Sequence, residues 1–116
     1  MKQYWNPLYL RTLRYCNILY QTALHHFKQK EWKEALDKYK EFLEYNKCDM
    51  DSYAEAAVCY FNIAKQKRKE DDGAYKQDYK KSISYLNKAI KQRPSSKRYS
   101  EFLADVKKLK KRLGGT

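Results

Sequence analysis

Apolar residues recur every three or four positions along most of this sequence. The clearest example is the stretch 32–45, where charged residues fill almost all of the remaining positions. Its apolar residues are Trp32, Ala35, Leu36, Tyr39, Phe42, Leu43 and Tyr45. On a helix of about 3.6 residues per turn, most of these side chains fall on one stripe, the pattern of a helix with one buried face. We therefore expect a helix here that ends near Asn46.

The same periodicity predicts helices on both sides of this stretch. A first helix starts at Asn6-Pro7, with Asn as the N-cap and Pro at the first helical position, and continues to about Gln29. A turn at 29–31 separates it from the helix that follows. A third helix begins at Met50, and either Asp49 or Asp51 can cap it.

Two more helices are expected in the second half of the chain. The first of them has its apolar positions at Tyr79, Ser82, Ile83, Leu86, Ala89 and Ile90, and Pro94 closes it. The last runs from Lys97 to about Leu113, with Ser95-Ser96 as its cap. No strong helix breaker stands between Pro7 and Gly73. The 116 residues therefore predict a single all-α domain of about five helices.

The spacing of small and large residues resembles the tetratricopeptide repeat, a helix–turn–helix unit with a period of about 34 residues. Leu19, Ala23 and Ala35 match its packing positions in the first copy. Tyr53, Ala56, Ala57, Tyr60 and Phe61 match the first helix of a second copy. The resemblance implies helical hairpins in a right-handed superhelical stack. It divides the chain into an N-terminal extension (1–15), repeat 1 (16–49), repeat 2 (50–96) and a capping helix (97–113).

Two departures from the family pattern bear on the turns. Ala35 and Ser82 are 47 residues apart, which exceeds the family period by 13 residues and indicates an insertion near 66–78. We expect this insertion to lengthen both helices of repeat 2, with a turn at 71–73. Lys30 stands where the family usually has glycine. A left-handed lysine costs on the order of 1 kcal/mol, so we expect a tighter or right-handed turn there.

The resemblance also implies a function class, protein recognition, because the first helices of such repeats line a concave groove. The matching positions are Asn17, Tyr20, Leu24, Phe27, Lys28, Asp51, Ala54, Val58, Phe61 and Asn62. This mainly apolar and aromatic set suits a partner's helix or extended segment. The basic clamp that binds a terminal carboxylate in the co-chaperone branch is absent, since its places hold Tyr20, Leu24, Val58, Glu101 and Asp105.

The N-terminal extension offers a second candidate interface, formed by Tyr4, Trp5, Leu8 and Tyr9. Aromatic residues are enriched at protein interfaces. Two alternatives stay open at this point: the extension, or the capping helix, fills the groove of its own chain. An acid-free start with Arg11 and Arg14 is also typical of a mitochondrial presequence, but serine is absent and the segment continues directly into the repeat.

Charge is unevenly distributed along the chain, whose net charge is +12. Residues 1–30 carry five basic groups and no acidic group, whereas residues 31–64 carry four basic and eight acidic groups. Residues 65–93 carry ten basic and four acidic groups, and residues 94–116 carry seven basic and two acidic groups. The basic positions of interest are Lys65, Lys67, Arg68, Lys69, Lys76, Lys80, Lys81, Lys107, Lys108, Lys110, Lys111 and Arg112. They favour an acidic partner, or a nucleic acid with Tyr75 and Tyr79 stacked on its bases, or they serve only solubility.

The sequence gives little support for a catalytic or metal-binding function. The adjacent His25 and His26 lack the i,i+4 spacing of a metal pair, and His26 is better explained as core filling. Three unpaired cysteines indicate a reducing compartment, and Cys59 is expected to be buried. We therefore expect no enzyme activity, cofactor or metal. With no secretory signal and no apolar run long enough for a membrane span, an intracellular and specifically cytoplasmic location is expected, with nucleus and organelles open. A homo-oligomer also stays open.

Overall fold

The computed structural model describes residues 7–47, 49–92 and 97–112, and these residues form five α-helices with no strand among them. The all-α prediction is confirmed. The helices are α1 (Pro7–Lys28), α2 (Trp32–Tyr45), α3 (Met50–Lys69), α4 (Tyr75–Gln92) and α5 (Lys97–Arg112). The proposed caps Asn6, Ser95 and Ser96 lie outside the described residues, as does Pro94.

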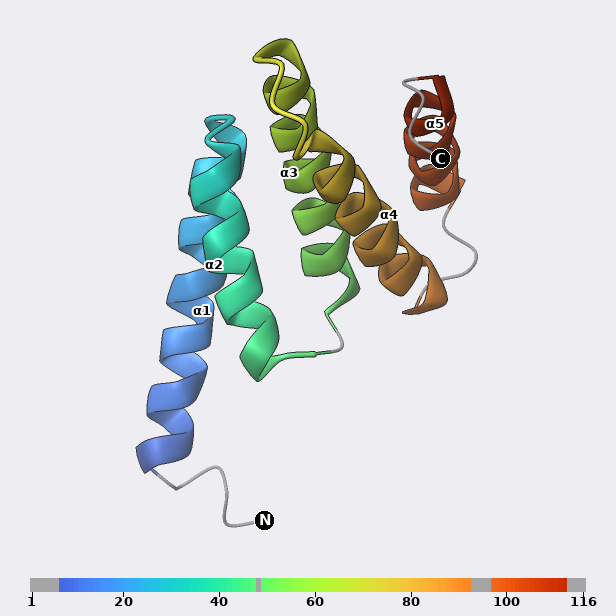
Figure 1. Cartoon of the computed structure of the whole chain (residues 1–116). Helices are drawn as coiled ribbons and strands as arrows, with labels where there is room; N and C mark the ends of the chain where they lie inside the picture. Colours follow the sequence, from blue (N-terminus) through green and yellow to red (C-terminus); the bar gives the residue numbers. More distant parts are fainter. Residues whose placement is uncertain (1–6, 48, 93–96, 113–116) are drawn as a thin grey trace.

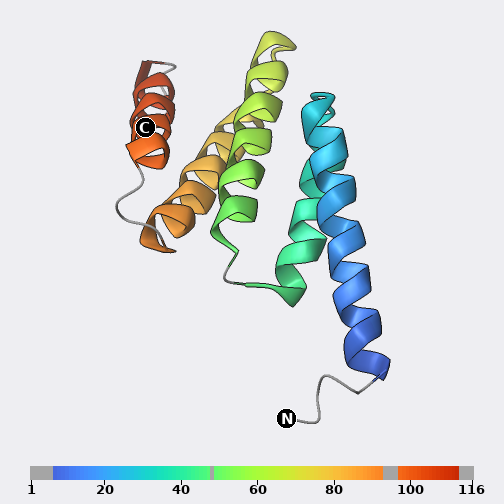
Figure 2. The same ribbon diagram turned by 180° about the vertical axis from the view of Figure 1, so that it is seen from behind.

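The helices form two antiparallel hairpins followed by one further helix (Figure 1). The first hairpin is α1–α2 and the second is α3–α4, while α5 packs beside α4. Helices α2 and α4 lie on the face seen in Figure 1, and α1 and α3 lie on the face seen from behind in Figure 2. Because α3 contacts both α2 and α4, it is the central helix of the stack.

The predicted stripe of α2 forms the buried face of that helix. Ala35, Leu36, Tyr39, Phe42 and Leu43 are all buried. Three of them join a core cluster together with α1 and α3, whose members are Ala23, Ala35, Leu36, Tyr39, Ala56, Cys59 and Tyr60. The fully buried alanines leave room for the helices to approach closely.

A second core cluster lies between α3 and α4, and α5 completes it. Ala54, Ala57, Leu86 and Ala89 are its buried members, and Phe102 of α5 packs against them. Ser82 is fully buried on α4, where its hydroxyl donates a hydrogen bond of 2.8 Å to the Ala57 carbonyl. This bond satisfies the only polar group that the Ser82 side chain carries into the helix seam.

The turn between α1 and α2 corrects the expectation for Lys30, which is left-handed with a φ of 63°. Two hydrogen bonds explain why the chain accepts this conformation. The amide of Lys30 donates to the Phe27 carbonyl at 3.0 Å, and that of Glu31 donates to the His26 carbonyl at 2.9 Å. Both carbonyls belong to the last turn of α1; that of Phe27 gains Lys30 as its partner, and that of His26 accepts from Glu31 as well as from Gln29 at 3.1 Å. These bonds offset the strain of the lysine.

The turn between α3 and α4 repeats this geometry one hairpin later. Asp71 is left-handed with a φ of 61°, and the amides of Asp71 and Asp72 donate to the carbonyls of Arg68 and Lys67 at 3.1 and 2.8 Å. The predicted turn at 71–73 is thus confirmed, with Asp71 and not Gly73 as its left-handed residue. Helix α4, with 18 residues, is longer than α2, with 14, whereas α3, with 20, is shorter than α1, with 22; the 13-residue insertion stays a prediction.

Candidate functional site

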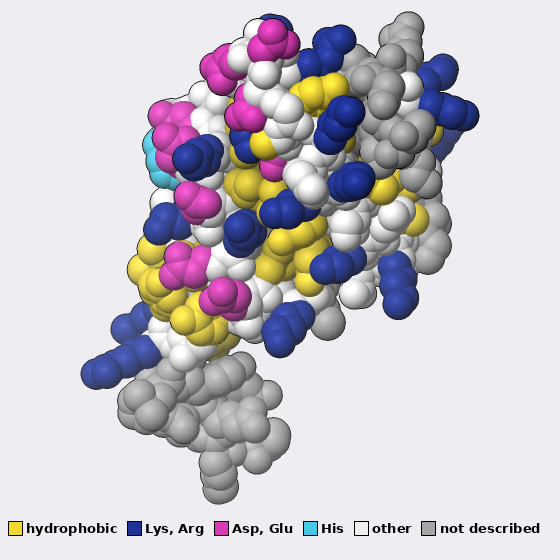
Figure 3. Space-filling view, viewed as in Figure 1, with side chains coloured by type: hydrophobic (Ala, Val, Ile, Leu, Met, Phe, Trp, Pro, Cys, Tyr) yellow, Lys and Arg dark blue, Asp and Glu magenta, His cyan; other side chains and the backbone are white. Residues whose placement is uncertain are grey.

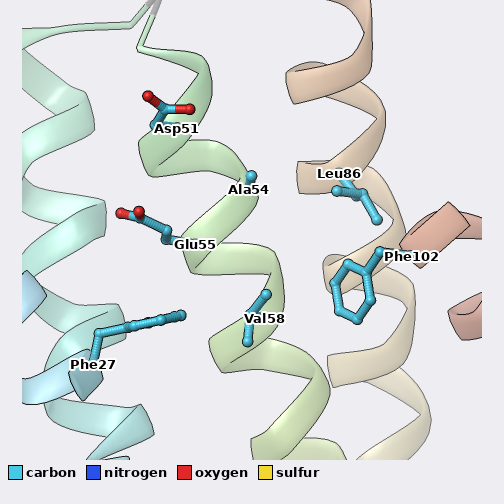
Figure 4. Close-up of a pocket in the computed structure, with 7 residues that line it drawn as sticks. All are labelled: Phe27, Asp51, Ala54, Glu55, Val58, Leu86 and Phe102. Atoms are coloured by element: carbon cyan, nitrogen blue, oxygen red, sulfur yellow. The ribbon is translucent and has the colours of Figure 1, made fainter. Parts of the chain in front are cut away.

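A hollow opens across α3, at the junction of four helices (Figure 4). It encloses about 240 Å³. Its lining residues are Phe27 of α1, Asp51, Ala54, Glu55 and Val58 of α3, Leu86 of α4 and Phe102 of α5. We call this hollow the α3 groove.

The apolar part of the α3 groove is held by the second core cluster. Ala54 and Leu86 are buried members of that cluster, and Phe102 packs against it. The Phe102 ring also meets the Phe61 ring at 5.5 Å, nearly edge to face. These contacts fix the Phe102 ring at the wall of the groove, and Val58 extends from α3 toward it in Figure 4.

The acidic part lies on the side of α3 that faces α1. Asp51 and Glu55 extend toward that side in Figure 4, one helical turn apart. The Tyr20 hydroxyl of α1 donates a hydrogen bond of 3.4 Å to the Glu55 carboxylate. No lysine, arginine or histidine among the described residues forms an ion pair with Glu55. The groove therefore combines an apolar wall with a carboxylate that lacks a cation.

Burial raises the pKa of Glu55 above that of an exposed glutamate, and the charges of Asp51 and Asp49 raise it further. The hydroxyls of Tyr39 and Tyr20 act in the opposite direction, because they favour the ionised carboxylate. The Tyr39 hydroxyl is buried beside Glu55 and has no hydrogen-bond partner of ordinary geometry among the described residues.

The two tyrosines remain protonated at neutral pH and can only support Glu55 as donors. Burial, followed by the Glu55 charge, raises the pKa of Tyr20 to about 12. Burial raises the pKa of Tyr39 as well. Their rings meet at 6.1 Å, and Tyr20 also contacts Phe42 at 5.4 Å. Residues of α1 and α2 thus position a carboxylate of α3.

The structure brings together four of the residues predicted for the groove: Phe27, Asp51, Ala54 and Val58. Tyr20 reaches it through Glu55. The Asn62 amide is used inside α3, where it donates to the Val58 carbonyl at 2.9 Å, and Phe61 is half-buried behind Phe102. The other three predicted residues, Asn17, Leu24 and Lys28, do not line this hollow.

Sequence reasoning missed three residues of the α3 groove: Glu55, Leu86 and Phe102. Glu55 could have been predicted from the sequence, because Asp51, Glu55 and Val58 follow one another at helical spacing on one face. The other two come from α4 and α5, and no local pattern places them beside α3.

The predicted N-terminal interface is described only in part. Tyr4 and Trp5 lie outside the described residues, as do the side chains of Leu8 and Tyr9. Since α1 has 22 residues and α2 has 14, the N-terminal turns of α1 run past the end of α2 (Figure 1). We call residues 7–14 the α1 overhang; within it Leu13 is 48% exposed. Directly beyond it, Ile18 is 60% exposed.

One aromatic contact ties α1 to the end of α2 beside the overhang. The Tyr15 ring meets the Tyr45 ring at 5.8 Å, and its hydroxyl donates to the Glu41 carboxylate. That hydrogen bond is the main reason why the pKa of Tyr15 is raised to about 12.

The predicted basic residues lie on α3, α4 and α5. In Figure 3 the Lys and Arg side chains are scattered over the face of α2 and α4, with hydrophobic side chains exposed between them. Lys67 pairs with Asp78 at 2.7 Å, and Lys65 and Lys81 lie over the rings of Phe61 and Tyr60. On α5, Lys108 and Lys111 are exposed, while the side chains of Lys107, Lys110 and Arg112 lie outside the described set.

The histidines and cysteines form no reactive or metal-binding group in the described part of the chain, where no three potential ligands lie together. His26 is half-buried and its Nδ1 lies 2.6 Å from Glu31, so the prediction that it fills the core is wrong. Cys59 is fully buried as predicted, and burial raises its thiol pKa to about 12, which keeps it unreactive at neutral pH. No helix of the described ranges is long and apolar enough to cross a membrane.

Comparisons with models of known protein families, with curated protein sequences and with solved structures found no match.

Proposed function

We propose that this chain is a non-enzymatic, tetratricopeptide-like module for protein–protein interaction, acting as an adaptor or scaffold subunit of a larger complex. Two helical hairpins with buried alanines in their seams, followed by a closing helix, support this assignment. The free thiols of Cys16 and Cys59 support an intracellular location, in the cytoplasm by preference.

The α3 groove is the observation that carries the proposal. Its volume of about 240 Å³ is below the roughly 300 Å³ at which small-molecule pockets begin. Its wall consists of aromatic and aliphatic side chains contributed by four helices, and it lies open along the face of α3. These dimensions suit one or two side chains of a partner's helix or extended segment.

The α1 overhang supplies a second contact surface. Leu10 and Leu13 are exposed there, and Ile18 and Tyr45 are exposed beside it. Leu10 and Leu13, three residues apart, are neighbours on the helix surface, and adjacent exposed apolar side chains are typical of a surface that another chain covers. The exposed lysines of the α3–α4 hairpin would steer an acidic region of the same partner toward the module.

Site-specific photo-crosslinking tests the proposal. A benzophenone amino acid is placed at Val58 in the groove, at Leu13 in the overhang, or at Ser84, an exposed control position on α4. Irradiation in cells that naturally produce this protein is expected to give discrete protein adducts from the Val58 and Leu13 variants and none from the Ser84 variant. The absence of adducts from both Val58 and Leu13 would contradict the proposal.

A nucleic-acid-associated subunit is the second candidate. The exposure of Arg68, Lys69, Lys76 and Lys80 around the α3–α4 turn favours it. Base stacking by Tyr79 is excluded, however, because that side chain is only 1% exposed. If this candidate is right, affinity for an arbitrary RNA falls steeply with salt, and a titration without binding at moderate salt removes it.

A further inference from the structure

The α3 groove has the opposite charge from most of the chain that surrounds it. The chain has a net charge of +12, yet among the described side chains no basic residue lines the groove and two carboxylates do. Glu55 is half-buried, and within the described residues no cation lies within ion-pair distance of it. A surface of this composition is complementary to a cation and unfavourable for an anion.

We propose that the α3 groove recognises a cationic segment of a partner protein, in which a lysine or arginine stands next to a bulky apolar residue. The inference rests on the proposed function and gives its partner a chemistry. The acidic region of the same partner would meet the exposed lysines of the α3–α4 hairpin, which do not line the groove.

The cation is assigned to Glu55. This carboxylate is partly removed from water; the Tyr20 hydroxyl donates a hydrogen bond to it at 3.4 Å, and the Tyr39 hydroxyl lies beside it. An ammonium or guanidinium group beside it would offset the cost of burial through a charge-assisted hydrogen bond. Burial raises the pKa of Glu55, so a cation beside the carboxylate would favour its ionised form.

The neighbouring apolar residue is assigned to the other side of α3. Ala54 and Val58 extend toward α4 and the Phe102 ring, whereas Glu55 extends toward α1 (Figure 4). Two adjacent side chains of an extended segment point in opposite directions and can therefore straddle the ridge of α3. The methylene stem of the lysine or arginine would itself lie along the Phe27 ring, which forms the α1 side of the groove.

Selection from a phage-displayed library of random short peptides tests this inference directly. Three immobilised proteins are compared: the wild type, Glu55→Gln, and Glu44→Gln as a charge-matched control at an exposed position of α2. The wild type and Glu44→Gln are expected to enrich peptides with lysine or arginine beside leucine or an aromatic residue. Glu55→Gln is expected to retain the apolar preference and to lose the cationic one.

A synthetic peptide from the wild-type selection then gives the size of the effect. Its affinity is expected to fall roughly tenfold with Glu55→Gln, the effect of losing a hydrogen bond to a charged group. Replacing the lysine of the peptide by methionine should have the same effect, and the two changes together should cost no more than either alone.

Dependence on pH provides an independent readout. The titratable groups around Glu55 are Tyr20 of α1, Tyr39 of α2, and Asp49, Asp51 and Cys59 on or before α3. The tyrosines and the cysteine stay protonated in acid. Affinity of the wild type should therefore decrease as pH falls through the pKa of Glu55, and Glu55→Gln should be flatter over that range.

The outcomes separate the inference from the function on which it rests. Selected peptides that are acidic, or that show no charge preference, overturn the cationic partner and leave the interaction module standing. No enrichment over the background overturns both. If the molar mass in solution rises with protein concentration for the wild type and not for Glu55→Gln, the groove binds a second copy of this chain, and the inference of a different partner is overturned.

Discussion

The two hairpins use the same turn but differ in what lies next to it. Lys30 and Asp71 are both left-handed, and in each case the amides of that residue and of the next one donate hydrogen bonds to carbonyls in the last turn of the preceding helix. The first hairpin closes with the Phe27 and Trp32 rings 5.4 Å apart. The second is longer and closes with an ion pair, Lys67 with Asp78, at 2.7 Å.

This difference shows that the turn geometry is set by the backbone and that the side chains set only its surroundings. Carbonyls at the end of any helix need partners, and a left-handed residue brings the next amides back to them. The turn geometry does not depend on whether aromatic rings or charged groups pack beside it. We therefore expect that the turn and the length of each hairpin can be changed independently.

The largest expected effect comes from the seam of the first hairpin. Ala35 is fully buried between α1, α2 and α3. Ala35→Asp places an unpaired carboxylate there and should lower the free energy of unfolding by more than about 3 kcal/mol. Urea denaturation measures this, with the exposed Lys33→Asp on the same helix as the control. A parent-like melting curve would show that this seam is not where the helices meet.

The ion pair of the second hairpin should rank next. Asp78 is 9% exposed, and Lys67→Met would leave its carboxylate without a cation. We expect a loss of about 2 kcal/mol in urea denaturation, below the roughly 3–5 kcal/mol of a fully buried pair because Lys67 is itself one-third exposed. Lys69→Met, at an exposed position of the same helix, should change stability little. Equal effects of the two substitutions would contradict a specific role for the pair.

Changes at the left-handed turn residues should be smaller and similar in the two hairpins. Lys30→Gly and Asp71→Gly relieve a strain of about 1 kcal/mol, while glycine adds freedom to the unfolded chain, so a net gain of about 0.5 kcal/mol is expected. Lys40→Gly, at an exposed position in the interior of α2, should instead cost about 1 kcal/mol. If glycine stabilises only one hairpin, the two turns are not energetically equivalent.

The smallest effect is expected at Glu55, where the two hairpins meet. Burial raises its pKa, so the folded state binds the proton more tightly than the unfolded state, and the ionised carboxylate destabilises the fold above that pKa. Glu55→Gln should therefore raise the melting temperature slightly at neutral pH. The difference should shrink as pH falls through the folded-state pKa. A stability gain that does not depend on pH would point to packing and not to charge.

Much of the architecture follows from the sequence alone, because helices and turns depend on residues close together in the chain. The stripe from Trp32 to Tyr45 and the turn at 71–73 were predicted from local spacing, and both are present. The buried Ala23 and Ala35 were also predicted, since small residues at matching positions let two helices approach. Asp49 was one of two candidates for the N-cap of α3, and its side chain accepts a hydrogen bond of 2.9 Å from the Ser52 amide.

Only the tertiary structure determined which residues line the groove and how the pKa of Glu55 is shifted. Leu86 and Phe102 reach the groove because α4 and α5 pack against α3, and that packing depends on contacts between residues far apart in the sequence. Helical spacing places Asp51 and Glu55 on one face, but the pKa of a carboxylate depends on how much water and which charges surround it, so the raised pKa of Glu55 could not be derived from its neighbours in the chain. Local spacing determined the helices, and the way they pack determined what the groove can bind.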